Sequence, residues 1–282
     1  MKITLDEAAK IIGDAQTIIL TSHIRPDGDS IGSTLGLMHY LMAQGKDARV
    51  LIDDDLPRIF NILPGIEMIE RPAEGARYTA DLLIVCDVEL KRTGEVLSAV
   101  DAVRVLNIDH HVTNDEEAEY LYLNADYAAT CEIMHDLILA MGGTFSLDVA
   151  TCLYTGIATD TGFFRFSNTT PHTMRAAADL VEVGVKPNII SVAMEMKSFD
   201  EMMAQVRAIR NLEMFHDGKV AAVFIDEERA KEVTTTEGLL DKLRVIEGTQ
   251  VVFFMKWLEK DTYRVSMRSK GTNVSRIAQG LG

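Results

Sequence analysis

The sequence predicts an α/β fold, with a mostly parallel sheet flanked by helices and a smaller C-terminal α/β domain. Through the first half of the chain, short apolar runs alternate with segments of helical periodicity. This alternation is typical of parallel strands that are covered by helices on both faces. After a long helical stretch, a second series of apolar runs begins. We expect a first domain over residues 1–190, a helical linker over 191–212 and a second domain over 213–282.

Residues 1–160 are expected to contain four strands and four helices. Thr4 and Glu7 have the spacing of a capping box, which predicts a helix that begins at once. Ser30 is the expected N-cap of the second helix, and Gly45 follows that helix at a position that suits a C-cap. The expected strands lie at residues 17–22, 48–52, 80–87 and 103–108, and the helices at 5–14, 30–44, 128–141 and 147–159.

Helical periodicity continues over residues 172–215, where Pro187 follows Gly184 and predicts a break. The apolar runs beyond it predict the second domain. Its expected strands lie at residues 219–225, 250–259 and 262–269, and its helices at 236–246 and 273–281.

Composition limits the classes of function. The 282 residues carry a net charge of −15, which argues against a protein that covers long nucleic acid with a basic face. A small anionic substrate is compatible with this charge, because a nearby metal or arginine dominates within about 8 Å. No apolar run approaches the roughly 18 residues of a membrane helix, and the three cysteines have neither zinc-type nor disulfide spacing. These features predict a cytoplasmic protein with free thiols and no membrane partner.

Three of the expected strands lead into side chains that can bind a metal. They are His23, Asp27 and Asp29 after the first strand, Asp87 at the end of the third, and Asp109, His110 and His111 after the fourth. Because the carboxyl ends of parallel strands meet at one edge of a sheet, we expect these side chains to converge. Imidazoles and carboxylates without a thiolate favour Mn²⁺ or Mg²⁺ over structural Zn²⁺. Their number suits two ions about 3.5–4 Å apart rather than one.

Each motif alone also has a simpler interpretation. Gly28 and Gly32 suit a tight strand-to-helix turn, and Asp-His-His also fits a helix start with surface histidines. A calcium loop from Asp27 fails, because its twelfth residue is Met38 and not Glu. A haloacid-dehalogenase nucleophile would follow its strand directly, whereas residues 23–26 intervene. The occurrence of all the motifs in one order favours the metal site.

Between residues 23 and 166 the chain carries HIRPDGDSIGS, an aspartate that ends the next long apolar strand, DHH and ATDTGFF, in that order. These four motifs resemble those of the DHH phosphoesterase superfamily. Residues 263–282, YRVSMRSKGTNVSRIAQGLG, are similar to the nucleotide-binding domain associated with that superfamily. Among the members of the superfamily, this chain most resembles the bacterial nanoRNase and pAp-phosphatase type in its size and its second domain. Cytosolic phosphodiesterases of cyclic-di-AMP and pApA belong to the same type.

The resemblance implies a role for each matching residue. It assigns one ion to His23 and Asp27, the second ion to Asp29, His110 and Asp160, and the bridge between them to Asp87. It implies two Mn²⁺ ions, with Mg²⁺ or Co²⁺ as substitutes, and a hydroxide activated by both metals for in-line attack on phosphorus. His111 would face the substrate phosphate, and Asp109 would orient the histidines. Arg268 in the second domain would bind the substrate.

The resemblance further implies a metal-dependent phosphodiesterase and phosphatase. Its substrates would be short oligoribonucleotides or linear dinucleotides, and 3′-phosphoadenosine 5′-phosphate (pAp). Alternatives are a cyclic-di-AMP phosphodiesterase, a catalytically idle nucleotide-binding sensor, and an inorganic pyrophosphatase or exopolyphosphatase. The expected partner is a small nucleotide or short single-stranded RNA and not long duplex nucleic acid. A homodimer is compatible with the sequence. The family motif usually continues past QGLG, so the second domain is expected to be incomplete at Gly282.

Overall fold

The computed structural model describes residues 1–233 and 238–280 of the chain. The chain divides into two compact units, Met1–Glu195 and Met196–Gly282. Each unit has its own sheet and its own hydrophobic core.

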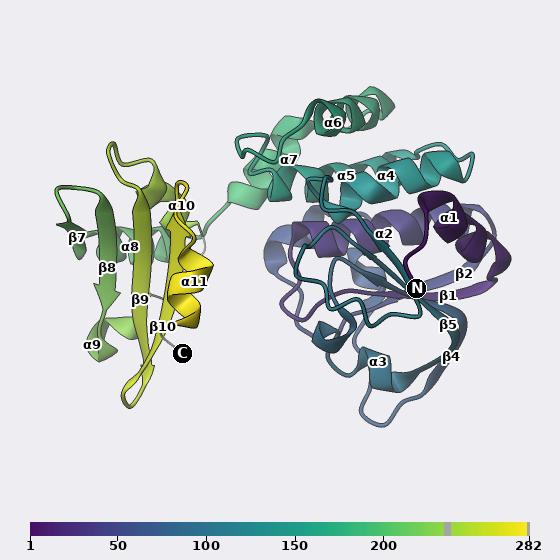
Figure 1. Ribbon diagram of the computed structural model, residues 1–282, viewed down its shortest axis with the longest axis horizontal. Helices are drawn as coiled ribbons and strands as arrows, with labels where there is room; N and C mark the ends of the chain where they lie inside the picture. The colour runs from purple at the N-terminus through teal and green to yellow at the C-terminus, as the bar shows by residue number, and fades with distance from the viewer. Residues whose placement is uncertain (234–237, 281–282) are drawn as a thin grey trace. The chain divides into compact units, whose positions relative to one another are not determined.

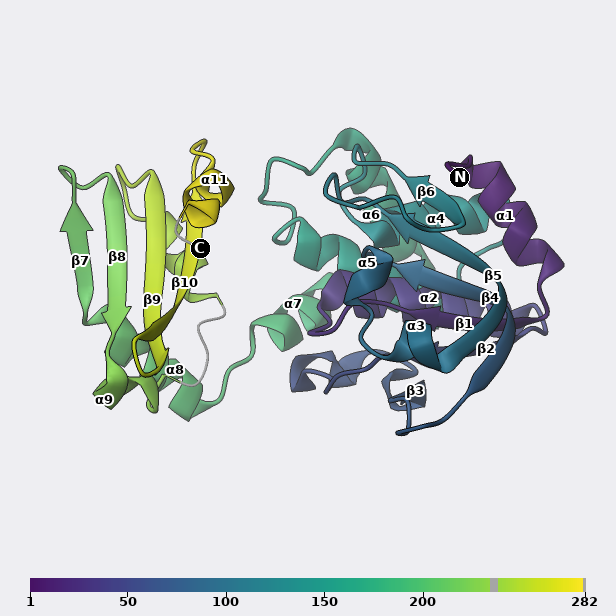
Figure 2. The ribbon, with the colours of Figure 1, turned by 60° about the horizontal axis from the view of Figure 1, so that its bottom comes forward.

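The first unit is built on a six-stranded sheet in which all pairings between the described strands are parallel (Figures 1 and 2). The strands are β1 (Thr17–Thr21), β2 (Asp47–Leu51), β3 (Ile69–Glu70), β4 (Tyr78–Cys86), β5 (Val100–Asp109) and β6 (Tyr120–Leu123). Their order is β3-β2-β1-β4-β5-β6, so that β1, β4 and β5 are neighbours in the middle of the sheet. The predicted parallel sheet is confirmed, and it brings the three strands with polar ends together.

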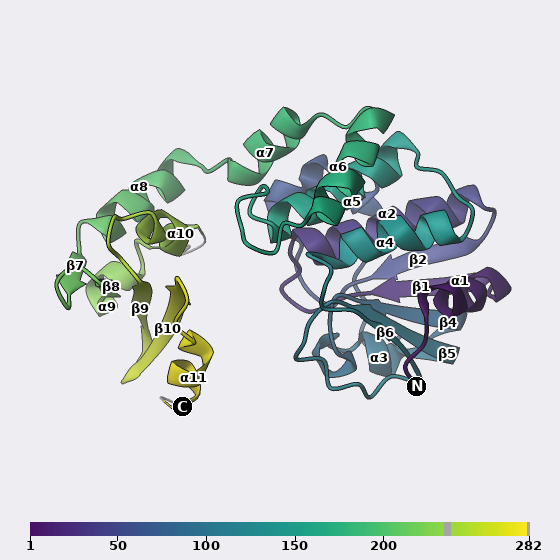
Figure 3. The same cartoon turned by 45° about the horizontal axis from the view of Figure 1, so that its top comes forward.

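Helices flank this sheet. They are α1 (Leu5–Asp14), α2 (Gly28–Ala43), α3 (Val96–Ala99), α4 (Thr130–Ala140), α5 (Leu147–Asp160), α6 (Pro171–Val183) and α7 (Pro187–Glu195), with short 3₁₀ turns at Arg58–Ile62, Ile66–Met68 and Leu90–Arg92. Figure 3 shows α2 and α4 over one face of the sheet and α3 on the other. The predicted capping box at the start of α1 is present, because Thr4 and Glu7 each accept a hydrogen bond from the other's backbone.

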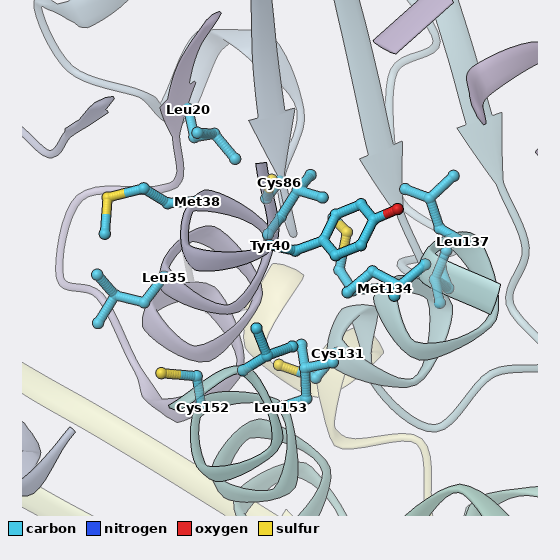
Figure 4. Close-up of a cluster of buried hydrophobic side chains, with 14 of the residues drawn as sticks. Leu20, Leu35, Met38, Tyr40, Cys86, Cys131, Met134, Leu137, Cys152 and Leu153 are labelled. Atoms are coloured by element: carbon cyan, nitrogen blue, oxygen red, sulfur yellow. The ribbon is translucent and has the colours of Figure 1, made fainter. Parts of the chain in front are cut away.

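The core of the first unit lies between the sheet and the layer formed by α2, α4 and α5. Figure 4 shows side chains from all of these elements meeting there, and all of those labelled are buried. They are Leu20, Leu35, Met38, Tyr40, Cys86, Cys131, Met134, Leu137, Cys152 and Leu153. Full burial of each large apolar side chain contributes about 1.5–3 kcal/mol to stability. The three cysteines are free and buried, as predicted.

The start of α2 differs from the prediction. Asp27, and not Ser30, is the N-cap, and its Oδ1 accepts the Ser30 N–H at 3.0 Å. Gly28 and Gly32 therefore belong to the helix and not to the turn before it. A Cβ added at Gly32 would lie 2.5 Å from the carbonyl oxygen of Cys152 on α5, so the glycine permits the close approach of these two helices.

The second unit contains a four-stranded sheet of order β10-β9-β8-β7, with β8 and β9 parallel and the other pairs antiparallel. Its strands are β7 (Leu212–Phe215), β8 (Val220–Ile225), β9 (Val251–Glu259) and β10 (Thr262–Ser269). Its helices are α8 (Phe199–Ile209), α9 (Glu227–Ala230), α10 (Leu239–Arg244) and α11 (Val274–Gln279). The predicted smaller α/β domain is confirmed. Residues 236–237 and 281, which were also expected to be helical, lie outside the described residues.

Several short elements escape prediction. The helical stretch expected over 172–215 is three helices, and its last residues form the strand β7. The strands β3 and β6 and the helix α3 were not expected, because two to four residues carry too little periodicity. Residues 191–212, the expected linker, contain the end of α7 and all of α8.

Candidate metal centre

The predicted ligands converge at the carboxyl edge of the first sheet. The loop after β1 runs into α2 and carries three of them. Asp87 follows β4, while Asp109 ends β5 and is followed by two histidines. Asp160, which does not follow a strand, is the last residue of α5 and also reaches this edge. The six expected metal-binding side chains are therefore close together.

One group of candidate ligands consists of His23, Asp27 and Asp87. Nε2 of His23 lies 3.7 Å from Oδ2 of Asp27 and 3.6 Å from Oδ2 of Asp87. One ligand atom from each residue lies within 4.8 Å of the others. A single ion can span these atoms, because first-row dications stand about 2 Å from each ligand atom.

A second group consists of Asp29, His110 and Asp160, again with ligand atoms within 4.8 Å of one another. Nε2 of His110 lies 3.8 Å from Oδ2 of Asp29 and 3.4 Å from Oδ2 of Asp160. It also lies 3.5 Å from Oδ1 of Asp87. Asp87 thus turns one carboxylate oxygen toward each group, which is the arrangement of a bridging ligand.

Both candidate ligand histidines point Nδ1 toward a backbone carbonyl oxygen. Nδ1 of His23 lies 2.9 Å from the carbonyl oxygen of Ile24, and Nδ1 of His110 lies 3.3 Å from that of Tyr127. A carbonyl only accepts, so each Nδ1 carries the proton and each Nε2 keeps its lone pair. Nε2 of His110 is buried and has no hydrogen-bond partner among the described residues. A metal ion can be the partner of such an atom.

Asp29 has a structural contact as well as a position in the ligand group. Its Oδ2 accepts the N–H of Thr130 at 2.6 Å and its Oδ1 accepts that of Cys131 at 2.8 Å. These are the first two N–H groups of α4, whose N-cap Ala129 has no side chain to accept them. Asp29 therefore caps α4 from the neighbouring helix α2.

Asp109 holds the two histidines that follow it. Its Oδ1 accepts the backbone N–H of His110 at 2.7 Å and of His111 at 3.1 Å, and lies 2.8 Å from Nδ1 of His111. Its Oδ2 accepts a hydrogen bond from Asn114, which also bonds Asn107. Although burial opposes ionisation, the bonds from His111 and Asn114 lower the pKa of Asp109. The same carboxylate raises the pKa of His111.

The crowded carboxylates of the site would be stabilised in their ionised form by bound cations. Burial, and then the carboxylates of Asp29 and Asp27, raise the pKa of Asp160 to about 9. Burial and its carboxylate neighbours also raise the pKa of Asp87 well above its ordinary value. Carboxylates at this spacing repel one another when ionised, and two dications would compensate four such charges. The donor set and its charge fit a pair of divalent ions.

Two contacts at the site are made by residues that the sequence motifs did not indicate. The Thr130 hydroxyl donates to Oδ1 of Asp87 at 3.0 Å, and the Tyr127 carbonyl accepts from His110. Both belong to the segment around the start of α4, which has no charged motif to signal it. Asp87 itself has a φ of 65°, the left-handed region that few non-glycine residues adopt. Such backbone strain often accompanies functional sites.

Arg268, the expected substrate arginine, lies near the end of β10 in the second unit. Its side chain is exposed, and its guanidinium donates to the carbonyl of Met267 at 3.0 Å.

The comparison with known families agrees with the geometry. The description "DHH family, N-terminal domain" matches residues 17–157, which include five of the six ligand residues. The chain belongs to the DHH family. A bifunctional oligoribonuclease and PAP phosphatase of Thermus thermophilus is 34% identical to this DHH-family chain, over 94% of the chain and 80% of the relative. A protein of the same description from Bacillus subtilis is 26% identical, over 97% and 88%.

A solved structure of an exopolyphosphatase-related protein from Bacteroides fragilis is similar to this DHH-family chain. The TM-score is 0.86 at 25% identity, and the match covers 95% of this chain and 83% of the other. The likeness therefore extends beyond the first unit. Among the described residues, no helix is long and apolar enough to cross a membrane.

Proposed function

We propose that this DHH-family chain is a metal-dependent hydrolase of phosphoric esters that cleaves short oligoribonucleotides or linear dinucleotides and removes the 3′-phosphate of pAp. The observation that carries the proposal is the buried Nε2 of His110, which has no hydrogen-bond partner among the described residues and faces three carboxylates. The relatives described as oligoribonuclease and PAP phosphatase support the substrate class.

The ligand groups suggest how two ions would be held. His23 and Asp27 would bind one, and Asp29, His110 and Asp160 the other, with Asp87 between them. We propose Mn²⁺ for both, with Mg²⁺ or Co²⁺ as substitutes, because mixed imidazole and carboxylate ligands suit these ions. Bound ions would supply Lewis acidity toward phosphate oxygens and would activate a water for attack.

The protein's own contribution centres on His111. Its Nδ1 is occupied by Asp109 at 2.8 Å, which leaves Nε2 to donate to a phosphate oxygen. The side chain is 46% exposed, so a substrate can reach it. Asp109 fixes the ring and favours its cationic form, and both effects help to stabilise negative charge that develops on the phosphate. His111 and Asp109 are therefore proposed to act on the substrate and on the ring's orientation, respectively.

We propose that the substrate is small and single-stranded. A net charge of −15 disfavours long duplex nucleic acid, while Arg268 could bind a terminal phosphate with its planar fork. A complete ligand set favours a hydrolase over a nucleotide sensor, which has no need of six metal ligands. Cyclic-di-AMP and pyrophosphate remain the alternatives to be tested.

The test is an activity panel in Mn²⁺ with pAp, pApA, RNA of two to five nucleotides, cyclic-di-AMP and pyrophosphate. We expect hydrolysis of pApA, short RNA and pAp, and a loss of at least about a hundredfold in Asp87→Asn, since the bridging ligand is removed. Asp101→Asn is the matched control, because Asp101 is exposed and lies at the end of β5 that is farther from the candidate metal centre. Full dinucleotide hydrolysis by Asp87→Asn would refute the site, and cleavage of pyrophosphate alone would refute the substrate class.

A further inference from the structure

A cluster of ionisable side chains lies beside the metal centre and is not used by the ligand set. Glu132 and Asp136 belong to α4, His172 lies in the first turn of α6, and Tyr127 lies on the segment between β6 and α4. Glu132 is buried to 1% exposure. A buried carboxylate needs partners, so its contacts show what the cluster holds together.

His172 lies between two carboxylates of α4. Its Nδ1 is 2.7 Å from Oε1 of Glu132, and its Nε2 is 3.1 Å from Oδ2 of Asp136. The other oxygen of Glu132 accepts the backbone N–H of Ala128 at 2.8 Å. The imidazole thus ties α6 to α4, and the buried carboxylate ties both to the segment before α4.

Tyr127 connects this cluster to the metal centre. Its hydroxyl donates to Oδ2 of Asp136 at 2.7 Å, and its ring meets that of His172 edge-on, with centroids 5.5 Å apart. Its backbone carbonyl accepts from Nδ1 of His110 at 3.3 Å. The residue that fixes the tautomer of His110 is therefore itself held at both its hydroxyl and its ring.

A second bond ties the same segment to another ligand residue. The Asn168 amide donates to the carbonyl of Ala128 at 3.2 Å and to that of Asp160 at 3.1 Å. His110 is thus bonded directly to Tyr127, whereas the backbone of Asp160 is linked to Ala128 through Asn168. A merely structural brace between α4 and α6 would not need these two contacts with ligand residues.

We propose that Tyr127, held by Asp136 and His172, is a positioning residue that sets the ring orientation and tautomer of His110 for metal binding. The inference rests on the proposed metal centre and deepens it. The hydroxyl of Tyr127 acts on His110 indirectly. Its hydrogen bond holds the position of the Tyr127 ring, and the ring holds the position of the Tyr127 backbone carbonyl. That carbonyl keeps the proton on Nδ1 of His110. Metal ligands depend on such outer contacts for both affinity and geometry.

The test compares Tyr127→Phe and His172→Ala with wild type. We expect Mn²⁺ affinity, measured by titration calorimetry, to fall about tenfold. In the metal-free variants, ¹⁵N shifts should show His110 as a mixture of tautomers, whereas metal-free wild type should show the Nδ1–H form. Excess Mn²⁺ should restore kcat. Tyr40→Phe is the matched control, because it removes the hydroxyl of a buried tyrosine on α2 outside the cluster.

The outcomes separate this inference from the proposed function. Folded Tyr127→Phe with wild-type Mn²⁺ affinity and a single His110 tautomer would overturn the inference, and so would an equal change in Tyr40→Phe. If His172→Ala does not fold, Tyr127→Phe decides alone, since it removes one oxygen. A wild type that binds Mn²⁺ but cleaves no nucleotide would refute the proposed substrates only, because affinity and tautomer are measured without them.

Discussion

The carboxylate of Asp29 has two kinds of contact. Each of its carboxylate oxygens accepts a backbone N–H at the start of α4, and Oδ2 also faces His110. Among the described residues, the carboxylate of Asp160, in the same candidate ligand group, accepts no hydrogen bond and has His110 as its ion-pair partner. Loss of Asp29 would therefore damage the fold as well as the metal centre, and loss of Asp160 would damage the metal centre only.

This difference can be measured in metal-free protein. We expect Asp29→Ala to have a free energy of unfolding about 2 kcal/mol below that of Asp160→Ala, because two buried N–H groups of α4 lose their acceptor. Urea unfolding in EDTA measures it, and both variants should lose Mn²⁺ binding. Equal stability of the two variants would show that the cap contributes nothing.

These residues also show where prediction from sequence ends. The ligand role of Asp29 was inferred from a motif, whereas its cap on α4 joins residues about 100 positions apart. The N-cap of α2 was assigned to Ser30 although Asp27 has that role, because both residue types favour the position. Tyr127 had no signal at all, since its contact with His110 is made by a backbone carbonyl.

At the scale of elements, α2 begins directly after the loop that carries His23 and Asp27. It packs closely on α5, whose last residue is Asp160. Glycines make this contact possible. A Cβ at Gly32 would lie 2.5 Å from a backbone oxygen of α5 and 2.9 Å from Sγ of Cys131. The distance between α2 and α5 thus depends on a missing side chain, and so does the distance between the ligands that they carry.

Gly32→Ala should therefore destabilise the protein by about 1–3 kcal/mol, the usual cost of overpacking, and weaken Mn²⁺ binding. Thermal unfolding and calorimetric titration measure the two effects. Gly13→Ala is the control, because nothing lies within 4 Å of its added Cβ. An alanine there should stabilise α1 by about 0.5–1 kcal/mol. A Gly32→Ala protein as stable as wild type would contradict the packing argument.

At the scale of the whole molecule, the topology explains why a local sequence motif could predict a site. The strands β1, β4 and β5 are adjacent and parallel, so their carboxyl ends meet at one edge. That rule predicts the convergence of the side chains that follow these strands from the sequence alone. It could not place Asp160, which comes from a helix, and it does not extend to Arg268, which belongs to the second unit with a separate sheet.

Arg268 therefore supplies a test of whether the second unit contributes to substrate binding. If it binds a substrate phosphate, Arg268→Ala should lower kcat/KM for pApA about 10–100-fold, the effect of losing a charged hydrogen bond, with Mn²⁺ affinity unchanged. Arg264→Ala is the matched control, because Arg264 lies on the same face of β10, four residues earlier, and is also exposed. Steady-state kinetics on both variants would decide. Equal losses in the two would indicate general electrostatic attraction of the substrate by β10, whereas unchanged kinetics in Arg268→Ala would leave the chemistry to the first unit alone.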